Sequence, residues 1–371
     1  MARLGDVCTV VSGSTPKSNV PEYWDGDIKW ITPAELTEES YIITDSARHI
    51  TELGVQKTGL KAFPAGTVIL SSRAPIGKTA IAGCEMYCNQ GFKNLICSEQ
   101  VYNRYLYWFL TCHTDYLNSL GRGATFKEIS KGIVENIEIP LPSFSKQVEI
   151  AQKFEKVSDL IALRKQQLAK LDELVKSRFV EMFGDRYTND RNWECKPLYK
   201  CADFFNGKAH EQVVDENGEY ILVTSRCIAS DVTDYRRTNA LMFPLKTNDI
   251  AMVMSDVPNG RALAKCILID EDDKYTLNQR ICCLRNYSFN PIFFYYLLNR
   301  HEYFLSFNDG NAQTNLRKDD LLACNIIMPP LELQNQFAAF VEQTDKSKFK
   351  IQKSLEKLET LKKALMQEYF G

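Results

Sequence analysis

The hydrophobic residues of this chain follow two patterns that alternate along the sequence. Short runs rich in β-branched residues, such as VCTVVSG, TVILSS and KNLICS, are separated by Gly, Pro, Ser and Asn, which predicts strands and turns. YNRYLYWFLTCHTDYLNSL and FNPIFFYYLLNRHEYFLSF have the spacing of amphipathic helices. These segments predict an α+β fold with β-rich domains at residues 1–143 and 187–331, each with a twisted antiparallel sheet and one or two helices.

A long helix is expected after each β-rich domain, at residues 144–186 and 332–371. No Gly or Pro occurs from Gln147 to Phe183, and apolar residues recur near the three-and-four spacing of a coiled-coil seam. At 1.5 Å per residue, each helix would be about 50 Å long. Two such helices can bury their apolar stripes against each other; the alternative is that each packs on its own domain. The expected helix–helix interface consists of Ile161, Leu168, Leu171, Val175, Met182, Ile351, Leu355, Leu358, Leu361 and Leu365.

The sequence contains an internal repeat. LAKLDELVKSRFVEMFG at 168–184 aligns without gaps with LEKLETLKKALMQEYFG at 355–371. Upstream, IEIPLPSFSKQ aligns with IIMPPLELQNQ, which pairs Gln147 with Gln336, and GTVILSSRAPIGKTAIAG aligns with NDIAMVMSDVPNGRALAK. Because the matches keep the same order, they indicate a duplication with a period of about 190 residues. The helical segments match most closely, and the loops of the two domains differ most.

The charge of the chain limits how it could bind nucleic acid. Its 45 basic and 47 acidic residues give a net charge of −2, and neither the domains nor the helices are strongly basic. Nonspecific affinity for DNA comes mostly from neutralised phosphates. The chain alone should therefore bind DNA weakly, through local patches, unless a partner supplies positive charge.

Composition also bears on location and metal content. The sequence has no run of about 18 apolar residues and no secretory signal, so we expect a cytoplasmic protein that does not span a membrane. Its 12 cysteines include no C-x-x-C pair. We therefore expect reduced thiols and no structural metal.

Two fragments resemble catalytic motifs without completing them. APIGKTA ends like a phosphate-binding loop, but Ser72 stands where that loop needs its first Gly. NPIF resembles part of the catalytic loop of adenine methyltransferases, but Ile292 replaces the second Pro, and Asn290 with Pro291 fits the start of a helix. No nucleophile and base occur at a usable spacing. We therefore expect no catalytic residues in this chain.

Recognition chemistry is the remaining signal. Arg and Lys can pair with guanine edges, and Asn and Gln with adenine edges. Such residues gather near glycines in corresponding loops of both domains, although each alone could be a solvated surface residue. The candidates for contacts with double-stranded DNA are Lys17, Arg73, Lys78, Gln90, Lys93, Arg122, Thr125 and Lys127 in the first domain and Lys208, Arg226, Arg261, Gln279, Arg280, Gln313, Asn315, Arg317 and Lys318 in the second.

Taken together, these features resemble the specificity subunits of Type I restriction–modification systems. SGSTPKSNVPEYWDGDIKWITPAEL looks like the opening of many target-recognition domains in this family, and GTVILSSRAPIGKTAI looks like the strand pair that follows. The Pro-Leu-Pro stretch running to Gln147 looks like the entry to the family's spacer helix. The resemblance covers essentially the whole chain. The second domain departs from it, because FFNGKAHEQVVDENGEYILVTSRCI lacks the Thr-Pro and Tyr-Trp of the first.

The resemblance implies a non-catalytic, DNA-reading subunit. The two helices would form an antiparallel coiled coil that acts as a ruler, and pseudo-twofold symmetry would relate the two domains. Each domain would read one half of a bipartite site. Two methyltransferase (modification) subunits and the restriction subunits would be the partners. S-adenosylmethionine, ATP and Mg would belong to those partners, which would also supply many of the phosphate contacts.

Two other functions remain open from the sequence. The chain could be a stand-alone scaffold whose helix pair serves oligomerisation and whose domains bind protein or carbohydrate, which suits its near-neutral charge. It could also be a methyltransferase that both reads and modifies DNA. The missing cofactor loop argues against that last interpretation.

Overall fold

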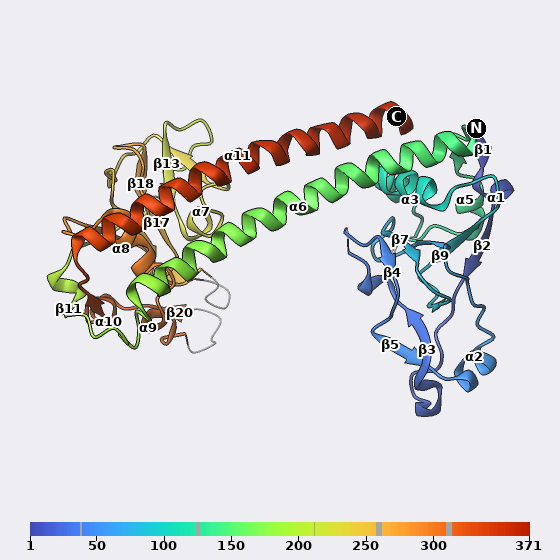
Figure 1. Cartoon of the computed structure of the whole chain (residues 1–371), viewed down its shortest axis with the longest axis horizontal. Helices are drawn as coiled ribbons and strands as arrows, with labels where there is room; N and C mark the ends of the chain where they lie inside the picture. Colours follow the sequence, from blue (N-terminus) through green and yellow to red (C-terminus); the bar gives the residue numbers. More distant parts are fainter. Residues whose placement is uncertain (38, 124–126, 211, 257–261, 309–313) are drawn as a thin grey trace. The chain divides into compact units, whose positions relative to one another are not determined.

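The computed structural model describes residues 1–37, 39–123, 127–210, 212–256, 262–308 and 314–371. It divides into two compact units. One unit comprises Met1–Lys165 with Lys353–Gly371, and the other comprises Gln166–Gln352. Each unit contains one β-rich domain together with one half of each of two long helices (Figure 1).

The first domain is built on two small sheets. A five-stranded sheet has the order β2-β9-β6-β7-β4, and a three-stranded sheet has the order β5-β3-β8. Helices pack around them. The strand bounds are β1 Ala2–Arg3, β2 Cys8–Ser12, β3 Trp24–Ile31, β4 Ile42–Ile43, β5 Arg48–Ile50, β6 Val68–Leu70, β7 Thr79–Ala82, β8 Tyr87–Cys88, β9 Lys93–Cys97 and β10 Glu138–Ile139. The helix bounds are α1 Leu4–Val7, α2 Glu52–Thr58, α3 Asn103–Cys112, α4 Thr114–Ser119 and α5 Lys131–Glu135, with 3-10 turns η1 Pro21–Tyr23 and η2 Pro33–Glu35.

The second domain repeats this plan with different lengths. Its larger sheet has the order β12-β19-β15-β17 and its three-stranded sheet the order β14-β13-β18. The strand bounds are β11 Cys195–Pro197, β12 Asp203–Asn206, β13 Tyr220–Val223, β14 Arg236–Thr238, β15 Ile250–Val253, β16 Ser255–Asp256, β17 Cys266–Leu268, β18 Tyr275–Leu277, β19 Ile281–Arg285, β20 Thr314–Asn315 and β21 Asn325–Ile327. The helix bounds are α7 Ser225–Ala229, α8 Pro291–Leu298, α9 Glu302–Leu305 and α10 Lys318–Leu322, with the 3-10 turn η3 Leu198–Lys200.

The pairing of strands differs from the expected antiparallel sheet in both domains. Most pairs are antiparallel, but β3 pairs with β8 and β4 with β7 in parallel, and β13 pairs with β18 in parallel. Long connections separate the members of each parallel pair, as parallel pairing requires. The prediction of a mixed, β-rich domain is confirmed, and the prediction of a purely antiparallel sheet is wrong.

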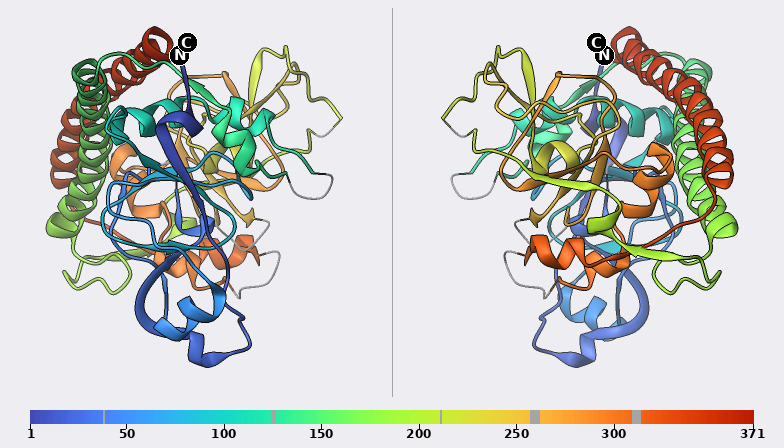
Figure 2. Two further views of the ribbon diagram at one scale, coloured as in Figure 1. Left: turned by 90° about the vertical axis from the view of Figure 1, so that its right-hand side faces the viewer. Right: turned by 90° about the vertical axis from the view of Figure 1, so that its left-hand side faces the viewer.

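Each domain is followed by one long helix. Helix α6 spans Phe144–Phe183 and α11 spans Leu331–Phe370, 40 residues each, or about 60 Å at 1.5 Å per residue. The two helices pack together and lie side by side in every view (Figures 1 and 2). Within each unit they are antiparallel, because Phe154 stacks on Phe370 in one unit and Phe183 contacts Phe337 in the other.

Burial along the helices follows the spacing of a coiled-coil seam. Between Ser158 and Leu174 of α6, the residues that are not fully exposed recur at three- and four-residue intervals. Val175 and Leu355 are buried, and the other expected interface residues are half-buried, with one exception. Leu361 is 45% exposed, because the neighbouring Lys362 occupies the seam position. The half-buried residues of the expected interface are Ile161, Leu168, Leu171, Met182, Ile351, Leu358 and Leu365.

A buried glutamine fixes the start of each long helix. Gln147 accepts a hydrogen bond from the Tyr102 backbone N–H at 2.9 Å and donates to the Pro142 carbonyl at 3.0 Å. Gln334 does the same with Asn290 and Pro329, at 2.9 and 2.8 Å. Gln147 therefore corresponds to Gln334, with the same separation as Leu168 and Leu355. The pairing of Gln147 with Gln336 in the sequence alignment is wrong by two residues.

The last phenylalanine of each long helix enters a domain core. Phe370 is buried beside Tyr105, Phe109 and Phe154, with ring centroids 5.3, 5.8 and 5.6 Å away. Phe183, its counterpart in the repeat, has no exposed surface and lies 4.7 Å from the ring of Phe293. The core of the first domain is therefore completed by α11, and that of the second by α6.

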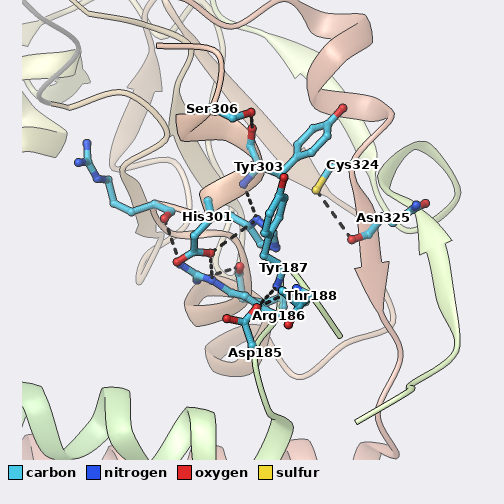
Figure 3. Close-up of polar contacts among 12 residues, drawn as sticks. Asp185, Arg186, Tyr187, Thr188, His301, Tyr303, Ser306, Cys324 and Asn325 are labelled. Atoms are coloured by element: carbon cyan, nitrogen blue, oxygen red, sulfur yellow. Dashed lines mark hydrogen bonds and ion pairs between the residues drawn. The ribbon is translucent and has the colours of Figure 1, made fainter. Parts of the chain in front are cut away.

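An arginine anchors the chain as it leaves α6. Gly184 ends the helix with φ +77°, a backbone conformation that favours glycine. The guanidinium of Arg186, which Figure 3 labels, then donates to the carbonyls of Leu297 and Arg300, each at 3.0 Å, and lies 3.0 Å from a carboxylate oxygen of Glu302. These carbonyls lie at the end of α8 and just beyond it. Arg186 therefore binds the segment that follows α6 to the second domain.

His301, beside this anchor, is a buried histidine of the second unit. Burial and the positive charge of Arg186 lower the pKa of His301 from 6.5 to about 4. The folded unit therefore binds this proton less readily than the unfolded chain does. Neutral His301 accepts a hydrogen bond from the Tyr303 backbone N–H at 3.2 Å (Figure 3).

We predict that stability is lost as the pH falls from about 6.5 to about 4, by up to about 3 kcal/mol from this residue. Denaturant unfolding of the His301→Asn variant, which keeps a cap acceptor, should show a smaller loss over this range. The control is His49→Asn, at a half-exposed histidine of the first domain. An equal acid loss in wild type and His301→Asn would contradict the prediction.

Candidate nucleic-acid interface

Three loops of the first domain converge on one site. The Ser72 backbone N–H donates to the Gly91 carbonyl at 2.8 Å, which joins the loop after β6 to the turn between β8 and β9. The Ile129 N–H donates to the Ser72 carbonyl at 3.0 Å, which adds the segment before α5. Arg73 and Arg122 each form a β-bridge with Glu128. Candidates from distant parts of the sequence therefore lie together at this junction.

Glu128 is the electrostatic centre of the junction. The Lys93 ammonium lies 3.1 Å from its carboxylate and 3.3 Å from the Ser72 hydroxyl. Lys93 is only 7% exposed, so its ammonium interacts with groups of the junction and has little contact with solvent. Arg122 and Lys127 are exposed and Arg73 is half-buried on the same segments. Those three basic residues are the ones that a phosphate or a base edge could reach.

The second domain builds the same junction with other side chains. The Met254 N–H donates to the Arg280 carbonyl at 3.1 Å, and the Leu316 N–H donates to the Met254 carbonyl at 2.7 Å. Strand β16 pairs with β20, which places Ser255 opposite Asn315. The junction therefore brings together the segments that carry four of the predicted DNA-binding residues, Gln279, Arg280, Asn315 and Arg317, all of them exposed.

A glycine lets a fourth segment approach each junction. A Cβ on Gly13 would lie 1.9 Å from the Cys88 carbonyl oxygen, and one on Gly207 would lie 2.0 Å from the Asn278 carbonyl oxygen. Only glycine allows so close an approach. In the first domain this brings the Thr15 hydroxyl within hydrogen-bonding distance of the Gln90 side chain. In the second, the exposed Lys208 directly follows the glycine.

Other predicted residues lie apart from the junctions or already have partners. The Lys78 ammonium donates to the Leu36 carbonyl, and Arg226 forms an ion pair with Asp234 at 2.5 Å. Lys318 lies with its ammonium 5.1 Å from the ring of Phe204, and Lys17 is exposed on the loop after β2. Thr125, Arg261 and Gln313 fall outside the residues that the structure describes.

The structure adds residues that the sequence did not single out. A cavity of about 260 Å³ in the second domain is lined by Arg236, Tyr235 and Asn278 as well as by the predicted Arg226 and Arg280. Arg236 lies on β14, away from any glycine, so the pattern of basic residues in glycine-flanked loops does not include it. The adjacent Arg-Arg pair in DYRRTN was the available signal.

Neither a metal cluster nor a membrane-spanning helix occurs in the described residues. Within residues 1–37, 39–123, 127–210, 212–256, 262–308 and 314–371, no group of three or more His, Cys, Asp or Glu side chains could hold a metal ion. In the same residues, no helix has the length and apolar character needed to cross a membrane.

Comparison with known proteins identifies the family. The Type I restriction modification DNA specificity domain matches twice, at residues 1–173 and 191–363. The MjaIX specificity subunit of Methanocaldococcus jannaschii is 30% identical over 398 residues, which cover 98% of this chain and 90% of the relative. The MjaVIII specificity subunit of the same organism is 23% identical, covering 99% and 90%.

Solved structures agree at the level of the fold. A specificity subunit from M. genitalium superposes with a TM-score of 0.59 at 14% identity, covering 100% of this chain and 95% of that one. A chain from a study of complex assembly and conformational transition of the type I R-M system gives a TM-score of 0.64 at 17% identity, covering 100% and 96%. Two matched domains and a full-length relative place the chain in the family of DNA-specificity subunits of Type I restriction–modification systems, as a non-catalytic subunit with two target-recognition domains.

Proposed function

We propose that the two domains read the two halves of a bipartite DNA site, each through its own loop junction. The observation that carries this proposal is the repetition of one hydrogen-bonded junction in both domains with different side chains. Ser72 to Gly91 in the first corresponds to Met254 to Arg280 in the second. The backbone frame is common, whereas the residues able to contact bases differ.

Each junction has some residues suited to contact phosphates and others suited to contact base edges. Exposed cations such as Arg122 and Lys127 can contact phosphates, which position a protein without carrying sequence information. Gln90 and Gln279 occupy the same place in the two β-turns and can make paired hydrogen bonds to an adenine edge. Lys93 serves here to hold Glu128, and through it the first junction, in place.

The long helices supply a fixed spacing in this proposal. Both helices carry buried and half-buried residues at three- and four-residue intervals, and each helix end is bound into a domain core by Phe183 or Phe370. Such a pair would act as a ruler that sets the length of the unread DNA between the half-sites. The domain bounds that follow are 1–143 and 187–331 for the recognition domains, with the helical spacers at 144–186 and 332–371.

The partners would perform the chemistry. Two methyltransferase subunits would bind the helices and domains and would bring S-adenosylmethionine, and the restriction subunits would bring ATP and Mg. The net charge of −2 supports this division, because the chain itself offers little general attraction for DNA.

The proposal is tested by methylation with and without the partner. The purified chain, a candidate methyltransferase partner and the two together would each be incubated with genomic DNA that lacks methyladenine. Single-molecule sequencing would then locate methylated adenines. We expect methylation at a split sequence only in the mixture. Methylation by the isolated chain, or none by the mixture despite complex formation, would overturn the proposal.

A further inference from the structure

The cavity of about 260 Å³ in the second domain gathers an unusual set of charges. Its lining includes Arg226, Arg236 and Arg280, and Asp234 is the one acidic residue among the described residues that line it. Three guanidinium groups and one carboxylate leave a formal charge of +2 in a small hollow. Thr224 and Ser225 add hydroxyl groups to the same wall.

Only one of the three arginines has a charged partner in the cavity, as far as the described residues extend. Arg226 Nε lies 2.5 Å from an Asp234 oxygen. No ion pair or side-chain hydrogen bond of Arg236 or Arg280 occurs within the described part of the chain, and both residues are exposed. Arg237, the next residue on β14, is different, because its guanidinium donates to the carbonyls of Gly218 and Glu219 at 3.3 and 3.2 Å.

The corresponding place in the first domain is closed. Gly91 occupies the position of Arg280, since each accepts the equivalent backbone hydrogen bond from Ser72 or Met254. A Cβ on Gly91 would lie 2.8 Å from the ring of Pro33, which leaves no room for an arginine without a shift. The strand register also makes Arg48 the counterpart of Arg236.

Arg48 is held in a way that Arg236 is not. Its guanidinium lies 3.6 Å from the ring centroid of Trp24, within the range of a cation–π contact. The two domains thus share a backbone frame and differ in whether it presents a group of arginines. That difference lies beside the proposed reading junction, because Arg280 belongs to both the junction and the cavity.

We infer that the Arg226–Arg236–Arg280 cavity binds one phosphate of the DNA backbone, and that the first domain has no counterpart. This inference rests on the proposed function and adds an asymmetry to it. A phosphate offers acceptor oxygens in several directions and can therefore accept hydrogen bonds from more than one of the three arginines that line the cavity. A guanine edge offers two acceptors, which one arginine satisfies. The second half-site would then contribute more to the salt dependence of binding than the first.

The test uses the complex of the chain with its methyltransferase subunits and a duplex that carries its methylation motif. Affinity is measured between 50 and 200 mM salt for wild type, Arg280→Gly and Arg280→Lys, with Lys200→Ala as a control for loss of one exposed charge outside the cavity. Neutralising one phosphate contributes a slope of about 0.9 in log K against log salt. We expect Arg280→Gly to lose about this much slope, whereas Arg280→Lys and Lys200→Ala keep it.

The same variants separate phosphate binding from base reading. A single-base change in the second half-site should weaken binding by the same factor for Arg280→Gly as for wild type. An altered base preference, or an unchanged slope in Arg280→Gly, would overturn the inference. If wild type binds the motif no better than unrelated DNA, the proposed function itself fails. Motif preference in wild type with an unchanged Arg280→Gly slope rejects the phosphate site alone.

Discussion

Replacing Phe370 with alanine should destabilise the first unit by about 3–5 kcal/mol, the range for removing a buried phenylalanine from a core. The ring is only 6% exposed and contacts Tyr105, Phe109 and Phe154. Its loss would leave a cavity between α3, α6 and α11. Although Phe370 lies far from the first domain in sequence, it completes that domain's core.

Hydrogen exchange can localise this effect. Amides of α3 and of the first half of α6 should lose protection in Phe370→Ala, while those of α8 should keep it. Phe183→Ala should show the reverse, because its ring lies in the second core beside Phe293. Leu361→Ala is the matched control on the same helix and should change stability by less than about 0.5 kcal/mol, since Leu361 is 45% exposed and lies outside both domain cores. Equal loss of protection in both units would contradict the prediction.

The long helices are the part of the fold that local sequence specifies best. The absence of Gly and Pro and the three-and-four spacing of apolar residues predicted both long helices, and the expected seam residues other than Leu361 are buried or half-buried. Leu361 is the exception, because Lys362 takes the seam position beside it and places its ammonium 5.0 Å from the ring of Trp108. A long lysine can cover apolar surface with its stem, so residue type alone does not assign the seam.

Features that depend on pairing between distant segments could not be predicted from local sequence patterns. The parallel pairs β3–β8 and β13–β18 join segments that are far apart in the chain, and no local pattern specifies them. The insertion of Phe370 into the first core has the same origin. The register of Gln147 with Gln334 was missed because two prolines and a second glutamine allowed a plausible shifted alignment.

The candidate site was predictable in its residue types and not in its contacts. Arg73, Lys93 and Arg122 were singled out because basic residues in repeated loops favour DNA binding. Their convergence on Glu128 depends on three backbone segments meeting, which loop composition does not reveal. Lys93 shows the limit most clearly, because a lysine in a reading loop and a lysine buried against a carboxylate have the same local sequence signal.

Exchanging the first domain should change one half of the recognised sequence and leave the other half unchanged. The exchange would replace residues 1–143, because α6 begins at Phe144 and the whole helix pair then stays in place. The donor domain must keep an aromatic residue at the position of Tyr105 and a hydrogen-bonding backbone group at that of Tyr102, so that Phe370 and Gln147 retain their partners. With the helices unchanged, the spacing between the half-sites should also be unchanged.

The control for this exchange is the reverse chimera, in which residues 187–331 are replaced and residues 1–143 are kept. It should alter the other half-site only. The second domain is bound to α6 through Phe183 and Arg186, so its donor must preserve the core around Phe293 and the carbonyl groups at the end of α8.

The most direct measurement of the central claim is the methyladenine motif of each exchanged protein, determined by single-molecule sequencing of DNA methylated with the partner methyltransferase. We expect two motifs that each share one half-site and the spacer with the wild-type motif. If replacing residues 1–143 changed both half-sites, the two domains would not be independent readers on a common frame, which would contradict the proposed function.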